Sequence, residues 1–216
     1  MHILRNKHHK IEPLWHVQLI LIVVIILQIL LAAGQTKLTR FGIPTLELLL
    51  LVVLQIVTPK TPTFTSKLRR IVAVTLIILI ATANVVALQQ LLEVVFNHSF
   101  GSANDLLLNA ARVYITTLIT FALLYWEMDG GGPGLRRKDN LDYHDFLFPQ
   151  QHYFNSTAGW HATFIDYLYI SLTNMTNFTS SDTLPLSRRA KLLMGSQSLI
   201  SLSIVVLVTA RAISLL

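Results

Sequence analysis

The sequence predicts an all-α integral membrane protein with about five transmembrane helices plus a short re-entrant helix before the last one. Two observations support this fold class. The chain of 216 residues is 53% hydrophobic and only 13% charged, whereas a soluble domain carries about 25% charged residues. The hydrophobic residues also gather in long runs with few charges, and in lipid such runs must close their backbone hydrogen bonds internally as helices. The chain has no cysteine, so disulfides and thiolate metal sites are excluded.

The first membrane helix is predicted over residues 14–33, with Trp15 and His16 at the interface. A signal peptide is the alternative, because basic residues precede the apolar run. However, the run is longer than a typical signal-peptide core, and residues 32–34 only weakly resemble a cleavage site. The segment is therefore predicted to be a membrane helix.

The next two helices are predicted over residues 42–57 and 71–88. The former is short, and Pro59 and Pro62 end it because proline cannot continue a helix. The latter continues as an amphipathic turn through Glu93.

The fourth helix is predicted over residues 106–126 and the fifth over residues 191–215. Between them, the loop 127–160 opens with Gly-Gly-Gly-Pro-Gly, a sequence that cannot be helical. The loop then carries more aromatic residues than disordered segments do, so it is predicted to pack on the rest of the chain.

A half-length helix is predicted over residues 161–176. It is too short and too polar to span a bilayer, but its apolar residues recur at helical spacing. They are Phe164, Ile165, Leu168, Tyr169 and Leu172. Two interpretations remain open: a re-entrant element, which is tolerated where the backbone is buried in protein or lines water, and an interfacial helix that lies flat on the membrane.

In the second half of this helix and after it, six residues come in a recognisable order. The order is Ser171, Thr173, Thr176, Asp182, Pro185 and Lys191. It resembles the pore helix, filter loop and outer mouth of tetrameric potassium channels, and the chain is also similar to uncharacterised bacterial membrane proteins whose channel-like tails lack the glycine filter. The resemblance implies a homo-oligomer, a tetramer in that family, and monovalent cations as the permeating species.

The filter-like loop consists of Thr176, Asn177, Phe178, Thr179, Ser180, Ser181 and Asp182. Potassium filters use glycines so that successive backbone carbonyls point at the axis. Here Thr179 and Ser181 occupy the glycine positions, where a β-branched residue at positive φ is strained. Ordinary potassium selectivity is therefore not expected. A ring of Asp182 would favour cations, Phe178 could plug the axis instead, and Asp182 could simply cap the turn before Pro185.

The last helix carries small and polar residues on one face. The candidate pore-lining residues are Met194, Gln197, Ser198 and Ser201. The same residue types also join helices to one another, and this interpretation is the favoured one. Near the end of this helix, Arg211 is expected to snorkel to headgroups, although in a tetramer it could ring the pore exit and oppose cations.

Basic residues divide unequally between the two ends of the predicted helices. If the N-terminus is cytoplasmic, that side holds thirteen of them: Arg5, Lys7, Lys10, Lys60, Lys67, Arg69, Arg70, Arg136, Arg137, Lys138, Arg188, Arg189 and Lys191. The other side holds four: Lys37, Arg40, Arg112 and Arg211. By the positive-inside rule the filter-like loop is cytoplasmic, which is inverted relative to a potassium channel. The alternative is that one segment, most simply the short second one, does not cross fully.

Other ionisable residues give weaker signals. Glu47 is expected to complement the N-terminal dipole of the second helix, and Arg112 to snorkel or to pair with Asp105 or Glu93. A loop metal site is the third hypothesis. Its ligands would be His144, Asp145, His152 and His161, whose spacing matches no standard motif.

Two regions are predicted. Residues 1–97 form an N-terminal three-helix membrane region. Residues 98–216 form a channel-like module with outer helix 106–126, loop 127–160, pore-like helix 161–176, filter-like loop 177–185 and inner helix 191–215.

The leading functional hypothesis is a channel-like protein of the plasma membrane (the bacterial inner membrane) that passes cations with non-standard or poor selectivity. The alternative is a non-conducting structural or interaction protein with the same architecture. No enzymatic activity, cofactor or metal is expected. The net charge of +6 is assigned to contacts with the lipid bilayer rather than with nucleic acid.

Overall fold

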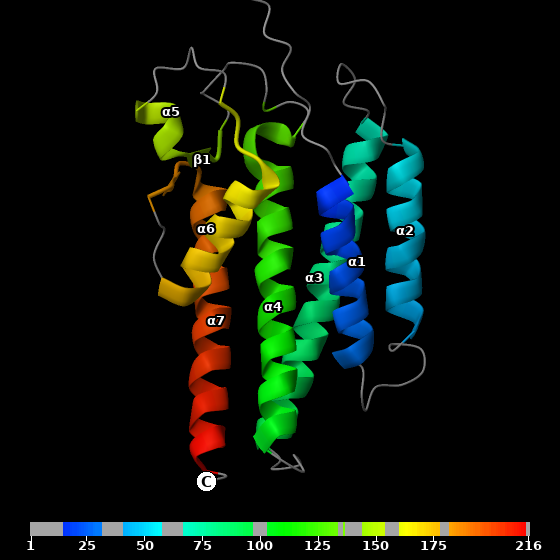
Figure 1. Cartoon of the computed structure of the whole chain (residues 1–216), viewed down its shortest axis with the longest axis vertical. Coiled ribbons are helices and arrows are strands. Elements are labelled where there is room, and N and C mark those ends of the chain that lie inside the picture. The colour runs from blue at the N-terminus through cyan, green and yellow to red at the C-terminus, as the bar shows by residue number, and fades with distance from the viewer. Residues whose placement is uncertain are drawn as a thin grey trace, which may run out of the picture.

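Five helices run side by side along one axis and alternate in direction (Figure 1). They are α1 (Trp15–Leu31), α2 (Ile43–Val57), α3 (Lys67–Phe96), α4 (Ala103–Met128) and α7 (Arg188–Ser214). The computed structural model describes residues 15–31, 41–57, 67–96, 103–133, 136, 144–153, 160–177 and 182–214. Because the helices alternate, the starts of α1, α3 and α7 lie at the same end of the bundle as the ends of α2 and α4. This end is called the upper end below.

Each of these helices follows an apolar run predicted from the sequence, with bounds that agree to within a few residues. Three contain stretches long and apolar enough to cross a bilayer: Lys67–Glu93, Leu106–Gly131 and Arg188–Arg211. The other two are shorter. The 15 residues of α2 rise about 22 Å, less than the hydrocarbon thickness of roughly 30 Å.

The predicted long loop between α4 and α7 is structured where it is described, and it packs on the bundle as expected. It contains the 3-10 turn η2 (Asp129–Gly131), the strand β1 (Phe146–Leu147) and the helix α5 (Pro149–Tyr153). The strand pairs antiparallel with β2 (Leu184–Pro185), a pairing that the sequence analysis did not predict. Phe146 and Phe148 are buried in the core.

The predicted half-helix is α6 (Phe164–Asn177), so Asn177, expected in the loop, is still helical. In Figure 1, α6 descends from the upper end and stops well short of the lower end. Phe178, Thr179, Ser180 and Ser181 lie outside the described residues.

The centre of the bundle is α4, which packs against α1, α3, α6 and α7. An upper apolar core joins residues of α1, α3, α4 and α6, for example Val24, Ile80 and Tyr167, and a lower one joins α3, α4 and α7. The predicted boundary at residues 97 and 98 falls between α3 and α4. The N-terminal helices and the C-terminal module therefore share both cores through α4.

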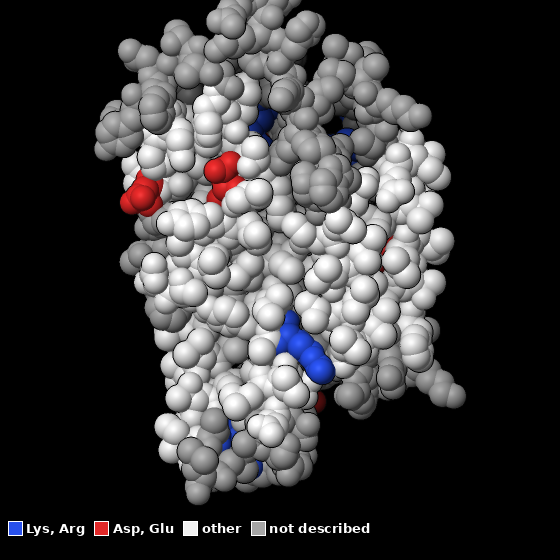
Figure 2. Space-filling view, in the orientation of Figure 1, with Lys and Arg blue, Asp and Glu red and all other residues white. Residues whose placement is uncertain are grey.

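The outer surface of the bundle is largely apolar. Large hydrophobic side chains are exposed on all five long helices, among them Leu30, Leu49, Ile78, Leu108 and Leu199. On the face shown in Figure 2, most of the described residues are uncharged; acidic groups interrupt this surface towards the upper left and a basic group interrupts it in the lower half. An amphipathic soluble bundle would carry charges on this side of its helices.

Candidate functional site

The predicted half-helix has a well-defined start at the upper end. The Thr163 backbone N–H donates to Oδ2 of Asp166 at 2.7 Å and the Thr163 hydroxyl donates to the same atom at 2.8 Å. This is a capping box, in which the residue at the third helical position satisfies the free N–H before the helix. Asp166 also complements the positive end of the α6 dipole.

The C-terminal end of α6 lies beside the middle of α7. The Ser201 hydroxyl donates to the carbonyl of Met175 at 2.7 Å, and Ser201 is the central residue of α7 (Arg188–Ser214). The last four carbonyls of any helix lack intrahelical partners, and Met175 provides one of those four. Thr176 and Asn177, at the tip, are exposed on the surface of the single chain.

The amide of Gln197 holds α6 against α4 and α7. Its nitrogen donates to the hydroxyl of Ser171 at 2.6 Å and to the carbonyl of Ser171 at 3.2 Å. Its oxygen accepts from the Tyr125 hydroxyl at 2.6 Å and from the Asn174 amide at 2.9 Å. Gln197 is completely buried, and these four bonds use both of its donors and both acceptor positions of its oxygen.

Asn174 and Ser198 extend this arrangement along α7. The Asn174 amide donates to the carbonyl of Met194 at 2.9 Å, and Ser198 donates to the Asn174 oxygen at 3.2 Å. We call the set of Tyr125, Ser171, Asn174, Gln197, Ser198 and Ser201 the α6–α7 polar network. The network lies where α6 packs against both α4 and α7.

The candidate pore-lining residues of α7 therefore all face α6 inside one chain. Met194, Gln197 and Ser201 are buried and Ser198 is half-buried. Their geometry is that of helix–helix contacts, the interpretation that the sequence analysis favoured. Asp182, in contrast, is exposed beside β2.

A second buried cluster surrounds Asp129, directly after α4, and the sequence analysis missed it. Oδ1 of Asp129 accepts from the backbone N–H groups of Asp145 at 2.6 Å and Phe146 at 3.3 Å. Oδ2 accepts from the Tyr167 hydroxyl at 2.5 Å, and the Arg136 guanidinium and His144 imidazole each lie 3.5 Å from it. Asp129 is completely buried, so this carboxylate fixes the long loop onto α6.

Arg136 supports the same cluster from the loop side. It donates to the carbonyls of Asp129 at 3.3 Å, Ala162 at 3.2 Å and Trp126. Its guanidinium also lies 4.5 Å from the centre of the Tyr167 ring, within the range of a cation–π contact. The chain can return in this way because Gly130, Gly131 and Gly132 have φ of 59°, 83° and 100°, a conformation that costs other residues energy. The sequence did contain a signal for this buried cluster: an acidic residue immediately before three glycines.

An ion pair joins the start of α7 to the long loop. Arg189, in the first turn of α7, donates to Asp145 at 2.8 and 3.1 Å. The backbone N–H of Leu186 donates to the carbonyl of Asp145 at 2.8 Å, beside the β1–β2 pair. Asp145 is thus used for structure, and not for the metal site considered from the sequence.

One expectation about ionisable residues is corrected, and another residue has a partner that was not expected. Glu47 is completely buried and lies beyond the first turn of α2, so it does not complement the helix dipole. With the amide nitrogen of Gln28 turned towards it, its carboxylate accepts at 2.6 and 3.0 Å across the α1–α2 interface. Arg112 donates to the carbonyl of Leu30 at 3.4 Å, near the end of α1; that it snorkels, or pairs with Asp105 or Glu93, stays a prediction.

Among the described residues, no group of three or more metal-ligating side chains comes together. His144 faces Asp129, and the side chain of His152 lies outside the described part of the chain. No family model matches the sequence, and no curated protein and no solved structure matches it either.

Proposed function

We propose that this chain is an integral membrane protein in which α1, α2, α3, α4 and α7 cross the bilayer. The support is the apolar outer surface of every long helix, together with three apolar stretches of spanning length. The basic starts of α3 and α7 share the upper end with the long loop. By the positive-inside rule this end is cytoplasmic, in the plasma membrane (the bacterial inner membrane). The re-entrant α6 then enters from the cytoplasmic side.

We further propose that α6 contributes to a cation-permeable pore in a homo-oligomer, a tetramer by the family resemblance. A single observation carries this proposal: the C-terminal end of α6 stops beside the middle of α7, with Thr176 and Asn177 exposed. The carbonyls of a helix end at this depth are tolerated only where they line water or are buried by protein. A helix C-terminus also carries about half a negative charge, which favours monovalent cations over anions.

The residues proposed to line the pore are those at the tip, Thr176 and Asn177, with the loop up to Asp182. Selectivity for potassium is not part of the proposal, because Thr179 and Ser181 stand where that family has glycines. Side-chain oxygens rather than stacked carbonyls would then meet the ion, which gives poor discrimination among monovalent cations.

Flux of cations into vesicles containing the purified protein tests this function. Wild-type protein should pass sodium and potassium at similar rates. Asn177→Lys should abolish the flux because it adds a positive charge at the negative end of α6, and Asn177→Asp should preserve or raise it. Glu93→Gln, which changes an exposed carboxylate on α3, is the matched control and should leave the flux unchanged. Absence of flux from wild type, Asn177→Asp and Phe178→Gly alike would contradict the pore.

The second candidate is a non-conducting structural or interaction membrane protein that keeps this architecture. The observation in its favour is the α6–α7 polar network, in which Gln197 has no hydrogen-bonding capacity left over. The polar face of α7 is then a contact within the chain, and α6 is packed rather than hydrated.

The absence of native cysteine allows the two candidates to be separated. In membranes, Thr176→Cys should react with a charged, water-soluble thiol reagent if the tip of α6 lines water. Ile78→Cys, at an exposed apolar position in the middle of α3, should stay unreactive in both cases. Protection of both cysteines would favour the non-conducting candidate.

A further inference from the structure

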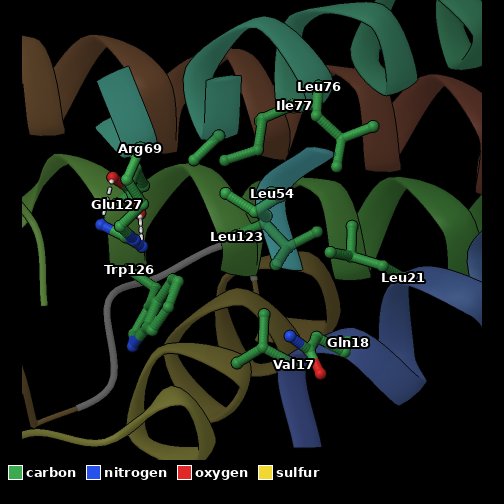
Figure 3. Close-up of a pocket in the computed structure, with 11 residues that line it drawn as sticks. Val17, Gln18, Leu21, Leu54, Arg69, Leu76, Ile77, Leu123, Trp126 and Glu127 are labelled. Atoms are coloured by element: carbon green, nitrogen blue, oxygen red, sulfur yellow. Dashed lines mark hydrogen bonds and ion pairs between the residues drawn. The ribbon is translucent and has the colours of Figure 1, made fainter. Parts of the chain in front are cut away.

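Two described glutamates of the long helices are buried, and their partners differ in kind. Glu127 of α4 accepts from the Arg69 guanidinium at 3.2 and 3.0 Å, at one end of a small cavity between α1, α2, α3 and α4 (Figure 3). Its negative charge therefore lies beside a positive one. Glu47 of α2 is 0% exposed, yet among the described residues it forms no ion pair. Its hydrogen-bonding partner there is the amide of Gln28 on α1.

The helices packed against α2 bring no described charge to the level of Glu47. These helices are α1 and α3, and Glu47 is the only ionisable residue of α2 itself. On α1 the only ionisable residue is His16, in the first turn at the upper end. On α3 the ionisable residues lie in the first turn and near the other end: Lys67, Arg69, Arg70 and Glu93. Arg112 of α4 donates to the carbonyl of Leu30 and forms no ion pair with Glu47.

Glu47 lies deep in the bundle. Ten residues separate it from Val57, at the upper end of α2, which is about 15 Å at 1.5 Å per residue. This end of α2 lies beside the basic start of α3 (Figure 1). In the proposed membrane orientation, Glu47 is therefore near the middle of a hydrocarbon region roughly 30 Å thick. A carboxylate without a cation is costly in such surroundings, and a carboxyl group avoids this cost by binding a proton.

The contact between Glu47 and Gln28 fits a protonated carboxyl group. One terminal atom of the Gln28 amide lies 2.6 and 3.0 Å from the two carboxyl oxygens of Glu47. The shorter distance is below the usual range for N–H···O bonds, about 2.7–3.2 Å, and within that for O–H···O bonds, about 2.5–3.0 Å. With the amide oxygen at this position, the acid hydroxyl of Glu47 donates to it; with the amide nitrogen there, a carboxylate accepts. A half-turn of the amide exchanges the two arrangements without moving either helix.

We propose that Glu47 and Gln28 form a binding site for one proton inside the membrane, between α1 and α2. In the occupied site the proton is bonded to a carboxyl oxygen of Glu47, and this O–H donates to Oε1 of Gln28. When the O–H bond breaks and the proton is released, the carboxylate accepts from the Nε2–H of Gln28, and the amide has turned. The site rests on the burial of Glu47 in the chain and on the membrane orientation proposed above, but not on cation conduction.

Infrared difference spectroscopy of the protein in phosphatidylcholine vesicles detects this proton, because a protonated carboxyl group has a C=O stretching band that a carboxylate lacks. At neutral pH the spectrum of wild type minus Glu47→Gln should contain this band. The band should move to lower frequency in heavy water, since the bound proton exchanges with solvent. Glu47→Gln should fold, because its amide has the shape of the acid and can donate to the same oxygen of Gln28.

Glu93→Gln, at an exposed carboxylate of α3, is the matched control, and its difference spectrum should lack the band. A wild-type protein whose Glu47 gives no such band at neutral pH, or a band that heavy water leaves in place, would overturn the proposal.

A second pair of variants tests the partner of Glu47. Gln28→Leu removes the acceptor, so the C=O band of Glu47 should move to higher frequency, as for a carboxyl group without a hydrogen bond. Gln55→Leu, the same change at an exposed glutamine of α2, should leave the band in place. Equal band positions in Gln28→Leu and wild type would contradict the assigned pair. Failure of the protein to associate with vesicles would contradict the membrane assignment on which the site rests. Ion flux is not measured, so each outcome is independent of the pore.

Discussion

The contacts that join the N-terminal helices to one another differ in kind from the contacts inside the C-terminal module. Between α1 and α2 the described core is apolar apart from the pair Gln28 and Glu47. Between α6 and its neighbours, in contrast, the α6–α7 polar network and the Asp129 cluster dominate. The half-helix α6 makes more polar contacts with its neighbours than α1 and α2 make with each other, although it is among the shorter helices.

In the proposed membrane orientation, this difference follows from where each helix ends. A helix that crosses a bilayer places both ends in water, so an apolar surface is enough to hold it. A helix that stops halfway leaves carbonyls at depth, and the segment that returns adds further polar groups. These groups must find partners in the protein. We therefore expect the loss of a polar residue to destabilise the module more than it destabilises the N-terminal helices.

The largest expected effect is at Asp129. Asp129→Ala leaves Arg136, the Tyr167 hydroxyl and two backbone N–H groups without their partner. Removing one partner of a buried ion pair costs about 3–5 kcal/mol, measured as the free energy of unfolding in detergent micelles. Glu93→Ala, at an exposed carboxylate of α3, should stay within about 0.5 kcal/mol. If Asp129→Ala and Glu93→Ala lowered the free energy of unfolding by similar amounts, the proposed difference between the two regions would be contradicted.

Gln197→Leu should come next. It preserves size but leaves the buried Tyr125 hydroxyl without its acceptor and removes one hydrogen bond each from Ser171 and Asn174, at a cost of about 2–3 kcal/mol. The matched variant Gln55→Leu changes an exposed glutamine on α2 and should be neutral or slightly stabilising in lipid. If Gln55→Leu were the more damaging of the two, α2 would not face lipid.

The ion pair between α3 and α4 sharpens the comparison, because it lies where the two regions meet. Glu127→Gln should destabilise by about 1.5–3 kcal/mol, because the hydrogen bonds of the buried Arg69 then go to a neutral group instead of a carboxylate. In Arg69→Met/Glu127→Leu most of this loss should be recovered, because apolar replacements of a buried pair are often neutral. If the loss of stability in the double variant equalled the sum of the losses in the two single variants, the two charges would not interact.

The smallest effect is expected at Arg189, whose side chain is 61% exposed. Arg189→Gln breaks its pair with Asp145 but should cost no more than about 1 kcal/mol, because solvent screens the interaction. Amide hydrogen exchange should speed up at Leu186, whose N–H donates to Asp145, and stay unchanged in α3. Unchanged exchange at Leu186 would mean that β1–β2 pairing alone holds the segment before α7 against the long loop.

Much of the fold was predictable because the relevant signal is local. The apolar runs that become α1, α2, α3, α4 and α7 and the half-helix α6 are visible as uninterrupted or periodic hydrophobicity. The β1–β2 pair was not predictable, because two residues on each side carry no periodic signal. The pore interpretation remains a hypothesis, since it depends on contacts between copies of the chain.

The sequence by itself determined the five long helices and the half-helix to within a few residues, and which end of the bundle is basic. These properties depend on residues close together in the chain, through hydrophobicity, proline and glycine. Only the tertiary structure decided which partner each polar side chain meets. Gln197 could have faced a pore, yet it bonds to Ser171, Asn174 and Tyr125. Asp129 could have been a surface residue, yet it is buried beside Tyr167. A hydrogen bond selects its partner by position in space, and residues 72 and 38 positions apart come together only once the helices have packed.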